Sequence, residues 1–346
     1  GDVPFINTVV NTADEEILYG PRINRDVVMD SVLNDLNYAA EHITQTNKQR
    51  FTADMALAMK ADVALYEGTY CKYRTVADND GKGPDLTRAQ RFLNECADAC
   101  TKLMTKDYHL NASYKGNYNS TDLSKNPEMI FYKPYSKGKL THSTINYTMN
   151  TSGTNGMTKD AFDAYLFLDG KPKATTSLAT NDAATLNANN QYGIEAQLAV
   201  RDKRLAETID PVLAFKGHAY QRAGTHAFTS TTGYAVSKYD NTTELTIDER
   251  NNNNRQYTDC PIFWLSVVYL DYAEAKAELG TITQTDLDNS INKLQIRAGL
   301  PGIHPAPAAA PANNMGVSNL LWEIRRARRC ELMFDNWTRY WDLIRW

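Results

Sequence analysis

The chain has 346 residues, of which 42% are hydrophobic and 23% charged, so it is long enough for one large core or two domains and has the composition of an ordinary soluble globular protein. Its net charge of -4, without a basic arm or stripe to neutralise phosphates, argues against a nucleic-acid partner. The five cysteines and six histidines show no metal-ligand spacing, so the sequence predicts neither a metal site nor a cofactor.

Three amphipathic helices are predicted in the first third of the chain. Apolar residues at helical spacing place the first at residues 26–43. The second begins after Thr52, a suitable N-cap, and its inner face alternates small and large residues up to Gly68, which lets a neighbouring helix approach closely. The third covers residues 86–104, so the second and third are expected to form an antiparallel helix hairpin.

The middle of the chain, residues 111–258, has a different composition. It is rich in Asn, Thr, Ser, Gly and Tyr, with short β-like runs at residues 129–132 and 234–238. Residues 173–190 are polar and without periodicity, which predicts a long surface excursion. Because the region is too long for a simple loop, we expect it to carry function on a scaffold made by the helices.

A second helix pair is predicted at residues 261–280 and 285–298. Gly280 suits the end of the first helix, and Thr285 with Asp288 forms a capping-box pattern at the start of the second. The two pairs resemble tetratricopeptide units, although their separation does not correspond to a fixed repeat period.

The last stretch, residues 318–346, predicts one long helix, preceded by an extended Pro/Ala-rich linker at residues 301–311. In its middle, charged residues interrupt the apolar stripe instead of lying wholly opposite it. An isolated charge run is usually a solvated face, but the surrounding Trp, Phe and Tyr side chains indicate a packed face, where charges need partners. We therefore interpret the run as a structural clasp. The predicted acidic partners are Glu331, Asp335 and Asp342.

The sequence of residues 325–346, Arg-Arg-Ala-Arg-Arg-Cys-Glu-Leu-Met-Phe-Asp-Asn-Trp-Thr-Arg-Tyr-Trp-Asp-Leu-Ile-Arg-Trp, resembles the signature helix of SusD/RagB-like proteins. These are surface-exposed outer-membrane lipoproteins that capture glycans or other nutrients for a TonB-dependent transporter. Further motifs resemble the family in the same order along the chain. They are the Gly-Asp-Val-Pro-Phe-Ile turn at 1–6, the helices at 22–43 and 52–68, Arg-Asp-Lys-Arg-Leu at 201–205, and the helix at 261–280 with Asp-Tyr-Ala-Glu-Ala at 271–275.

The resemblance implies a mainly α fold in a single SusD-like domain over residues 1–346. A tetratricopeptide-like scaffold of helix hairpins would occupy residues 1–110 and 259–346, and an irregular, partly β, loop-rich insertion would occupy residues 111–258. The implied function is glycan binding at the surface of a Gram-negative, Bacteroidota-like bacterium and delivery to a SusC-like transporter, without catalysis. Family members begin with a lipoprotein signal and continue past the signature helix. We therefore expect this chain to be an internal portion of a longer protein, whose lipid anchor belongs to the missing start.

We expect the insertion to supply the side chains that bind sugars. Sugar rings stack their C–H faces on aromatic rings, and their hydroxyls pair with Asn, Asp and Arg. Ligand residues of the family vary between members and lie in loops, so none is carried over by position and the prediction rests on composition. The predicted ligand-binding residues are His218, Tyr220, Arg222, Phe228 and Tyr234, together with Tyr118, Tyr132 and Tyr135. For each ring, the alternative is a place in a small core of the insertion itself.

Two other function classes stay open. A glycoside hydrolase on a helical scaffold needs two carboxyl groups a fixed short distance apart, and Asp160 with Asp163, or Asp248 with Glu249, are candidates. The third class is a tetratricopeptide-like protein-interaction module without a sugar site. Exposed rings lining a cleft on the loop side would favour ligand capture, whereas complete burial of the rings would favour the scaffold role alone.

Overall fold

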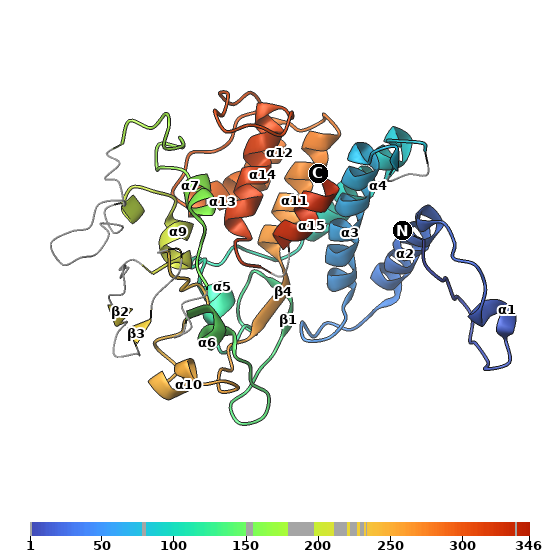
Figure 1. Cartoon of the computed structure of the whole chain (residues 1–346), viewed down its shortest axis with the longest axis horizontal. Coiled ribbons are helices and arrows are strands. Elements are labelled where there is room, and N and C mark those ends of the chain that lie inside the picture. Colours follow the sequence, from blue (N-terminus) through green and yellow to red (C-terminus); the bar gives the residue numbers. More distant parts are fainter. Residues whose placement is uncertain are drawn as a thin grey trace.

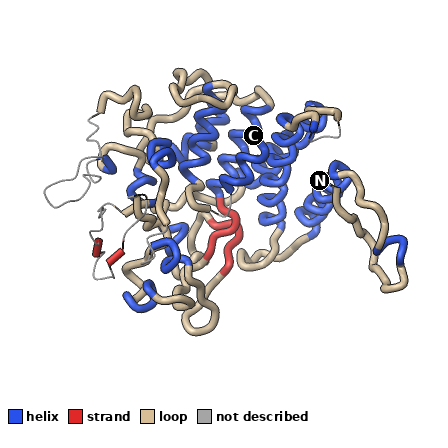
Figure 2. The backbone as a smooth tube through the Cα atoms, in the orientation of Figure 1, coloured by secondary structure: helices blue, strands red, loops and turns tan. Residues whose placement is uncertain are grey.

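The fold is mainly helical, as the sequence predicts, and its strands form two short two-stranded sheets within the part of the chain that is described (Figure 2). The computed structural model describes residues 2–77, 81–149, 155–178, 197–210, 220–221, 227–228, 232, 234–335 and 338–346. No helix in these ranges is both long enough and apolar enough to cross a membrane.

The first helix pair is confirmed. After the short α1 (Glu15–Leu18), α2 (Arg25–His42) leads to α3 (Ala53–Tyr73) and α4 (Leu86–Met104), which pack against each other along their length. The predicted cap is present, because the Thr52 side chain accepts a hydrogen bond from the Met55 amide at 3.0 Å.

Helix α3 continues for five residues beyond Gly68, where the sequence predicts its end. Gly68 lies inside α3 and is buried at the crossing with α4, where a Cβ atom added to it would lie 2.7 Å from Leu93 Cγ. The glycine is therefore needed for close helix packing rather than for helix termination.

The second pair begins differently from the prediction. Residues 260–264 form strand β4 (Cys260–Trp264), which pairs antiparallel with β1 (Met129–Lys133). Helix α11 (Leu265–Glu278) therefore starts four residues later than predicted. The helix predicted from residue 261 was wrong at its start, because Pro261, Phe263 and Trp264 pair with β1 of the insertion. A proline is tolerated in a strand that has only one neighbour. Gly280, with φ +69°, ends the helix as predicted.

The following helix is split in two. Helix α12 (Gln284–Asn289) and α13 (Ile291–Arg297) are separated at Ser290, whose hydroxyl donates to the Asp286 carbonyl at 2.6 Å. The capping box is formed by Thr283 and Asp286, two residues earlier than the predicted pair. Serine hydroxyls bonded to the preceding turn bend helices, which accounts for the break.

The final stretch is also two helices rather than one. Helix α14 (Asn319–Glu331) ends in a turn with Phe334 at φ 67°, and α15 (Thr338–Arg345) packs on α3. Two side chains of the insertion donate hydrogen bonds to backbone carbonyls of the turn. Lys238 Nζ donates to the Met333 carbonyl at 2.7 Å, and Tyr239 Oη donates to the Phe334 carbonyl at 2.6 Å. These long-range bonds explain why helical periodicity in the sequence did not predict the break.

Where the insertion is described, its elements are short, and they include β1. The others are α5 (Gly116–Asn119), α6 (Thr144–Met149), α7 (Lys159–Ala164), α9 (Lys203–Thr208), α10 (Ile247–Asn251), β2 (Tyr220–Gln221) and β3 (Ala227–Phe228). The β-like run at 129–132 is β1, but residues 234–238 form no strand, only one bridge between Val236 and Ile209. Most of the predicted polar excursion lies outside the described residues.

Of the four hydrophobic clusters among the described residues, two form most of the core, one large and one smaller. The large cluster joins α3, α4, α11, α13 and α14, and these helices lie side by side although they come from both ends of the chain (Figure 1). The smaller cluster belongs to the insertion and packs on Cys330 and Met333 of the scaffold. The insertion therefore sits on α14, which faces both clusters.

Candidate functional site

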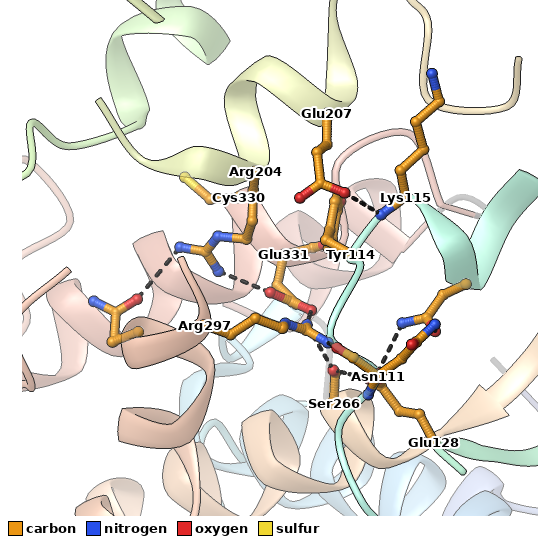
Figure 3. A network of polar contacts seen from close by, with 12 residues as sticks. Asn111, Tyr114, Lys115, Glu128, Arg204, Glu207, Ser266, Arg297, Cys330 and Glu331 are labelled. Carbon is orange, nitrogen blue, oxygen red and sulfur yellow. Dashed lines mark hydrogen bonds and ion pairs between the residues drawn. The ribbon is translucent and has the colours of Figure 1, made fainter. Parts of the chain in front are cut away.

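The contact between insertion and scaffold is made by buried charges around Glu331 (Figure 3). The Glu331 carboxylate lies between two arginines, Arg204 of α9, at 2.8 Å, and Arg297 of α13. Burial on its own raises the pKa of the Glu331 carboxyl, but the ion pairs with Arg297 and Arg204 outweigh it, and the pKa lies below its usual range. The carboxylate is therefore ionised at neutral pH.

A second buried carboxylate, Glu128, extends this cluster into the start of β1. It pairs with Arg297 at 2.8 Å and accepts hydrogen bonds from the Asn111 amide and the Asn117 side chain, each at 2.9 Å, and from Ser266 of α11. One arginine thus bridges carboxylates of the insertion and of α14. The predicted burial of the charge run is confirmed for Arg325 and Arg328, but Glu331, predicted as a partner of that run, pairs instead with arginines of α9 and α13.

The arginines of the signature helix also find buried partners. Arg328 contacts Asp271 at 2.6 Å and Asp342 at 3.0 Å, and Arg325 contacts Glu278 at 2.8 Å. Asp335, the remaining predicted partner, is held by a lysine of the insertion at 2.9 Å.

The acidic residues of α11 were not predicted as partners. Asp271, Glu274 and Glu278 recur at helical spacing on a helix whose buried face is mainly apolar, and all three are buried. That pattern, carboxylates within an apolar helical stripe, is the signal that could have paired α11 with the arginine-rich helix.

A pocket of about 690 Å³ lies between the clasped regions. One wall comes from α7 and the residues that follow it, and the other from α14, α15 and the linker before α14. Its apolar lining residues are Ala164, Leu166, Pro172, Ala174, Ala310, Pro311, Ala312, Met315, Trp322, Leu343 and Trp346. Its polar lining residues are Asp160, Asp163, Asn314, Glu323, Arg325, Arg326, Arg329 and Arg339. Size, position and a mainly apolar wall with a few charged groups are typical of small-molecule sites.

Three arginines of the pocket wall are paired with carboxylates. Arg326 pairs with Glu323 one turn away, and Arg329 pairs with Asp160 at 2.6 Å. Arg325 pairs with Glu278 of α11. These pairs fix the side chains that frame the pocket.

Arg339 differs from the other three. Within the described residues it has no hydrogen bond or ion pair, and its guanidinium lies over the Trp346 ring at 5.4 Å. Burial and the nearby Arg329 guanidinium lower the pKa of Arg339. Trp346 itself is anchored, because its indole nitrogen donates to Glu274 at 2.7 Å.

Three of the predicted ligand-binding rings are core residues. Tyr118 and Tyr132 belong to the large cluster and Tyr234 to the smaller one, where it stacks on Phe162 with centroids 4.5 Å apart. These rings are buried and thus take the place in a core that was the alternative for each ring, because abundance of tyrosine does not distinguish core from surface.

Among the described side chains, the other predicted ligand-binding residues do not belong to the large or the smaller cluster. Tyr135 is half-buried, and its ring meets His142 edge-on at 4.7 Å. The backbones of Tyr220 and Phe228 face each other across the β2–β3 pair. Their side chains, and the whole of His218 and Arg222, lie outside the described part. Of the predicted side chains that are described, none lines the pocket.

The carboxylates considered for hydrolysis are engaged by cations. Asp163 pairs with Lys159, Asp248 with Arg255, and Asp160 with Arg329 as above. A hydrogen bond from Lys137 lowers the pKa of Glu249, opposite to the raised pKa of a general acid.

Comparison with known proteins identifies the family. The model of the SusD family matches residues 127–346, well over half of the chain. The chain belongs to the SusD family. The signature helix and the α11 motif therefore mark a SusD-family scaffold, in which Arg328 and Glu331 make the buried contacts described above.

Solved structures show the same fold over the whole of this SusD-family chain. A SusD-like carbohydrate binding protein from Bacteroides fragilis matches with TM-score 0.68 and 21% identity, covering 100% of this chain and 62% of the other. A second SusD-like protein from the same species matches with TM-score 0.66 and 24% identity, covering 100% and 64%.

A further structure, solved with a xylogluco-oligosaccharide, matches with TM-score 0.60 and 17% identity, covering 100% of this chain and 61% of the other. The chain thus spans somewhat less than two thirds of the length of these proteins. No curated protein matches it.

Proposed function

We propose that this SusD-family chain captures a glycan at the bacterial cell surface and passes it, uncleaved, to a SusC-like TonB-dependent transporter in the outer membrane. The observation that carries the proposal is the family match over residues 127–346. Solved proteins of the same fold include one described as carbohydrate binding and one crystallised with a xylogluco-oligosaccharide, which supports a sugar as the ligand class.

The pocket of about 690 Å³ is our candidate for the ligand site. It offers the two kinds of contact that a sugar needs. The indole of Trp322 and the neighbouring apolar side chains give a surface for C–H ring faces, and Asn314 with the charged groups gives partners for hydroxyls. Because the arginine–carboxylate pairs hold the wall in place, little side-chain entropy is lost on binding.

The insertion supplies a second, predicted group of contacts. Tyr135 keeps a partly exposed ring, and His218, Tyr220, Arg222 and Phe228 stay predictions from composition. Such separated contacts along one oligosaccharide raise affinity through multivalency without any chemical step. The oligosaccharide would then be released when the transporter competes for it. A lipid anchor would keep the binding protein at the outer membrane.

The test is calorimetry against a panel of oligosaccharides, with a reducing-end assay on every ligand that binds. We expect saturable binding without new reducing ends, and Trp322→Ala weakens it about 3- to 10-fold, the range for loss of an aromatic contact. Trp341→Ala is the matched control, because Trp341 is 51% exposed on α15 and does not line this pocket. Tyr220→Ala and Tyr135→Ala measure the contribution of the insertion.

Two results would overturn the proposal. Release of reducing ends by the wild type would show hydrolysis in place of capture. An absence of binding across the whole panel would remove the glycan as the ligand class.

A further inference from the structure

Charge matching within the pocket leaves one cation over. Each carboxylate of the wall is already next to a cation: Asp160 to Arg329, Asp163 to Lys159, and Glu323 to Arg326. Asp342, three positions after Arg339 on α15, is held by Arg328 and Arg345. Among the described residues, Arg339 is therefore the pocket arginine without an ion pair or hydrogen bond of its own, and Asp342 and Asp160, both engaged by other arginines, act on it only from a distance.

The position of Arg339 favours the binding of an anionic group. Its side chain is half-buried against the Trp346 ring and lies near the guanidinium of Arg329. Both the partial loss of water and the like charge disfavour the free cation. A carboxylate in the pocket relieves both, because it accepts two parallel N–H bonds from the planar guanidinium and shields it from its neighbour.

The remaining walls indicate what carries that anionic group. A volume of about 690 Å³ is far more than a single small anion fills, and Trp322, Met315 and Leu343 offer an apolar surface beside the charge. A sugar ring that bears an acidic substituent has both features within one unit: C–H faces for the indole and an anion for the arginine.

We propose, on the basis of the glycan-binding function proposed above, that the pocket selects an acidic saccharide, with the anionic group of one sugar unit paired to Arg339 and a ring face packed on Trp322. A uronate carboxylate and a sulfate ester share this chemistry. The carboxylate fits the flat fork of the guanidinium better, so uronates are the expected class.

The experiment compares matched ligands on the full chain by calorimetry. The ligands are an oligogalacturonate, the same oligomer as its methyl ester, and a sulfated neutral oligosaccharide. We expect the ester to bind about tenfold more weakly than the acid, the loss of one charge-assisted pair, and the affinity for the acid to fall with salt.

Variants assign the effect to the residue. Arg339→Gln lowers affinity for the acid about tenfold and leaves the ester unchanged, whereas Arg339→Lys keeps part of the preference because the charge remains. Arg50→Gln, an exposed arginine outside the pocket, makes the same change of net charge and leaves both affinities as in the wild type.

The outcomes separate this inference from the proposed function. Equal affinity for acid and ester, or an Arg339→Gln variant that keeps the full preference, overturns the acidic-saccharide inference while binding itself upholds capture. A stronger response to the sulfated oligomer than to the uronate overturns the assignment to carboxylates. No binding of any oligosaccharide by the wild type overturns both.

Discussion

The scaffold and the insertion are stabilised by different kinds of contact. In the scaffold, small apolar residues at helical spacing, such as Ala61, Ala64 and Ala273, have no exposed surface and let α3, α4 and α11 pack closely. In the insertion, side chains bond to backbone groups far away in sequence. The Asn119 side-chain amide donates to the Asp240 carbonyl at 2.9 Å, and the Asn241 side-chain amide donates to the Asn119 carbonyl at 2.7 Å.

This difference shows how an irregular region is kept in place on a regular one. Periodic packing needs only neighbouring turns, whereas the insertion depends on individual polar bonds that each satisfy a buried group. The two regions meet at buried ion pairs, where Glu331 of α14 holds Arg204 of the insertion. Stability of the contact, and of the pocket beside it, should therefore depend strongly on single charges.

The largest expected effect comes from removing the charge shared by both regions. Glu331→Gln leaves Arg204 and Arg297 buried without their common partner, so we expect the free energy of unfolding to fall by about 3–5 kcal/mol. Urea unfolding measures the loss, and limited proteolysis should cut the insertion before the scaffold. Asp107→Asn, at a carboxylate whose side chain is 96% exposed, is the control. A loss below about 1 kcal/mol would contradict the role of this contact.

An ion pair within the scaffold should make the free energy of unfolding depend on pH. Burial alone raises the pKa of the Glu274 carboxyl, but the ion pair with Arg345 at 2.7 Å outweighs it and lowers the pKa to about 2. A carboxyl whose folded pKa lies below its ordinary value stabilises the fold above that ordinary value, and the contribution is lost as the pH falls toward 2.

The wild type should therefore lose about 3 kcal/mol of stability from this group between roughly pH 4.5 and 2. In Glu274→Gln that part of the pH dependence disappears, and the exposed Glu41→Gln serves as the control. Parallel stability–pH curves for Glu274→Gln and the wild type would exclude the assignment.

The smallest expected effect separates packing from backbone conformation. Gly68→Ala brings a Cβ to 2.7 Å from Leu93 Cγ, and overpacking outweighs the gain in helix propensity, for a net loss of about 1 kcal/mol. Gly138→Ala in the insertion meets nothing within 4 Å, but its φ of +73° costs a similar amount. Thermal unfolding of both, alone and combined with Leu93→Ala, should show rescue for Gly68→Ala only. Rescue of both, or of neither, would be inconsistent with this distinction.

The sequence predicted the elements whose signals are local. Periodicity and a capping threonine placed α3 and α4 within a few residues, apart from the end of α3. It missed the turn after α14 because the groups that hold it, Lys238 and Tyr239, lie far away in the chain. It missed β4 for the same reason, since only pairing with β1 makes those residues a strand.

The site was harder to predict than the fold. Residue type identified sugar-binding side chains but gave no information on burial, so Tyr118 and Tyr132 were proposed as contacts although they are core residues. Trp322 and Arg339 line the pocket of about 690 Å³, yet they lie in or next to the motif that was interpreted wholly as scaffold. A signature helix can have one buried face and still present its other face to a cavity, which no linear motif reveals.

Because the two helix pairs share one core, the first pair cannot complete its packing while the rest of the chain is still being synthesised. The α4 thiol Cys96 contacts the Asp271 carbonyl of α11, a residue 175 positions later in the chain. A nascent chain that has completed α3 and α4 therefore still lacks the helix that covers Cys96 and Cys100, and it exposes an apolar face until α11 is synthesised. In the finished fold, burial raises the pKa of both thiols and keeps them unreactive, so the chemical reactivity of these cysteines changes when the core closes.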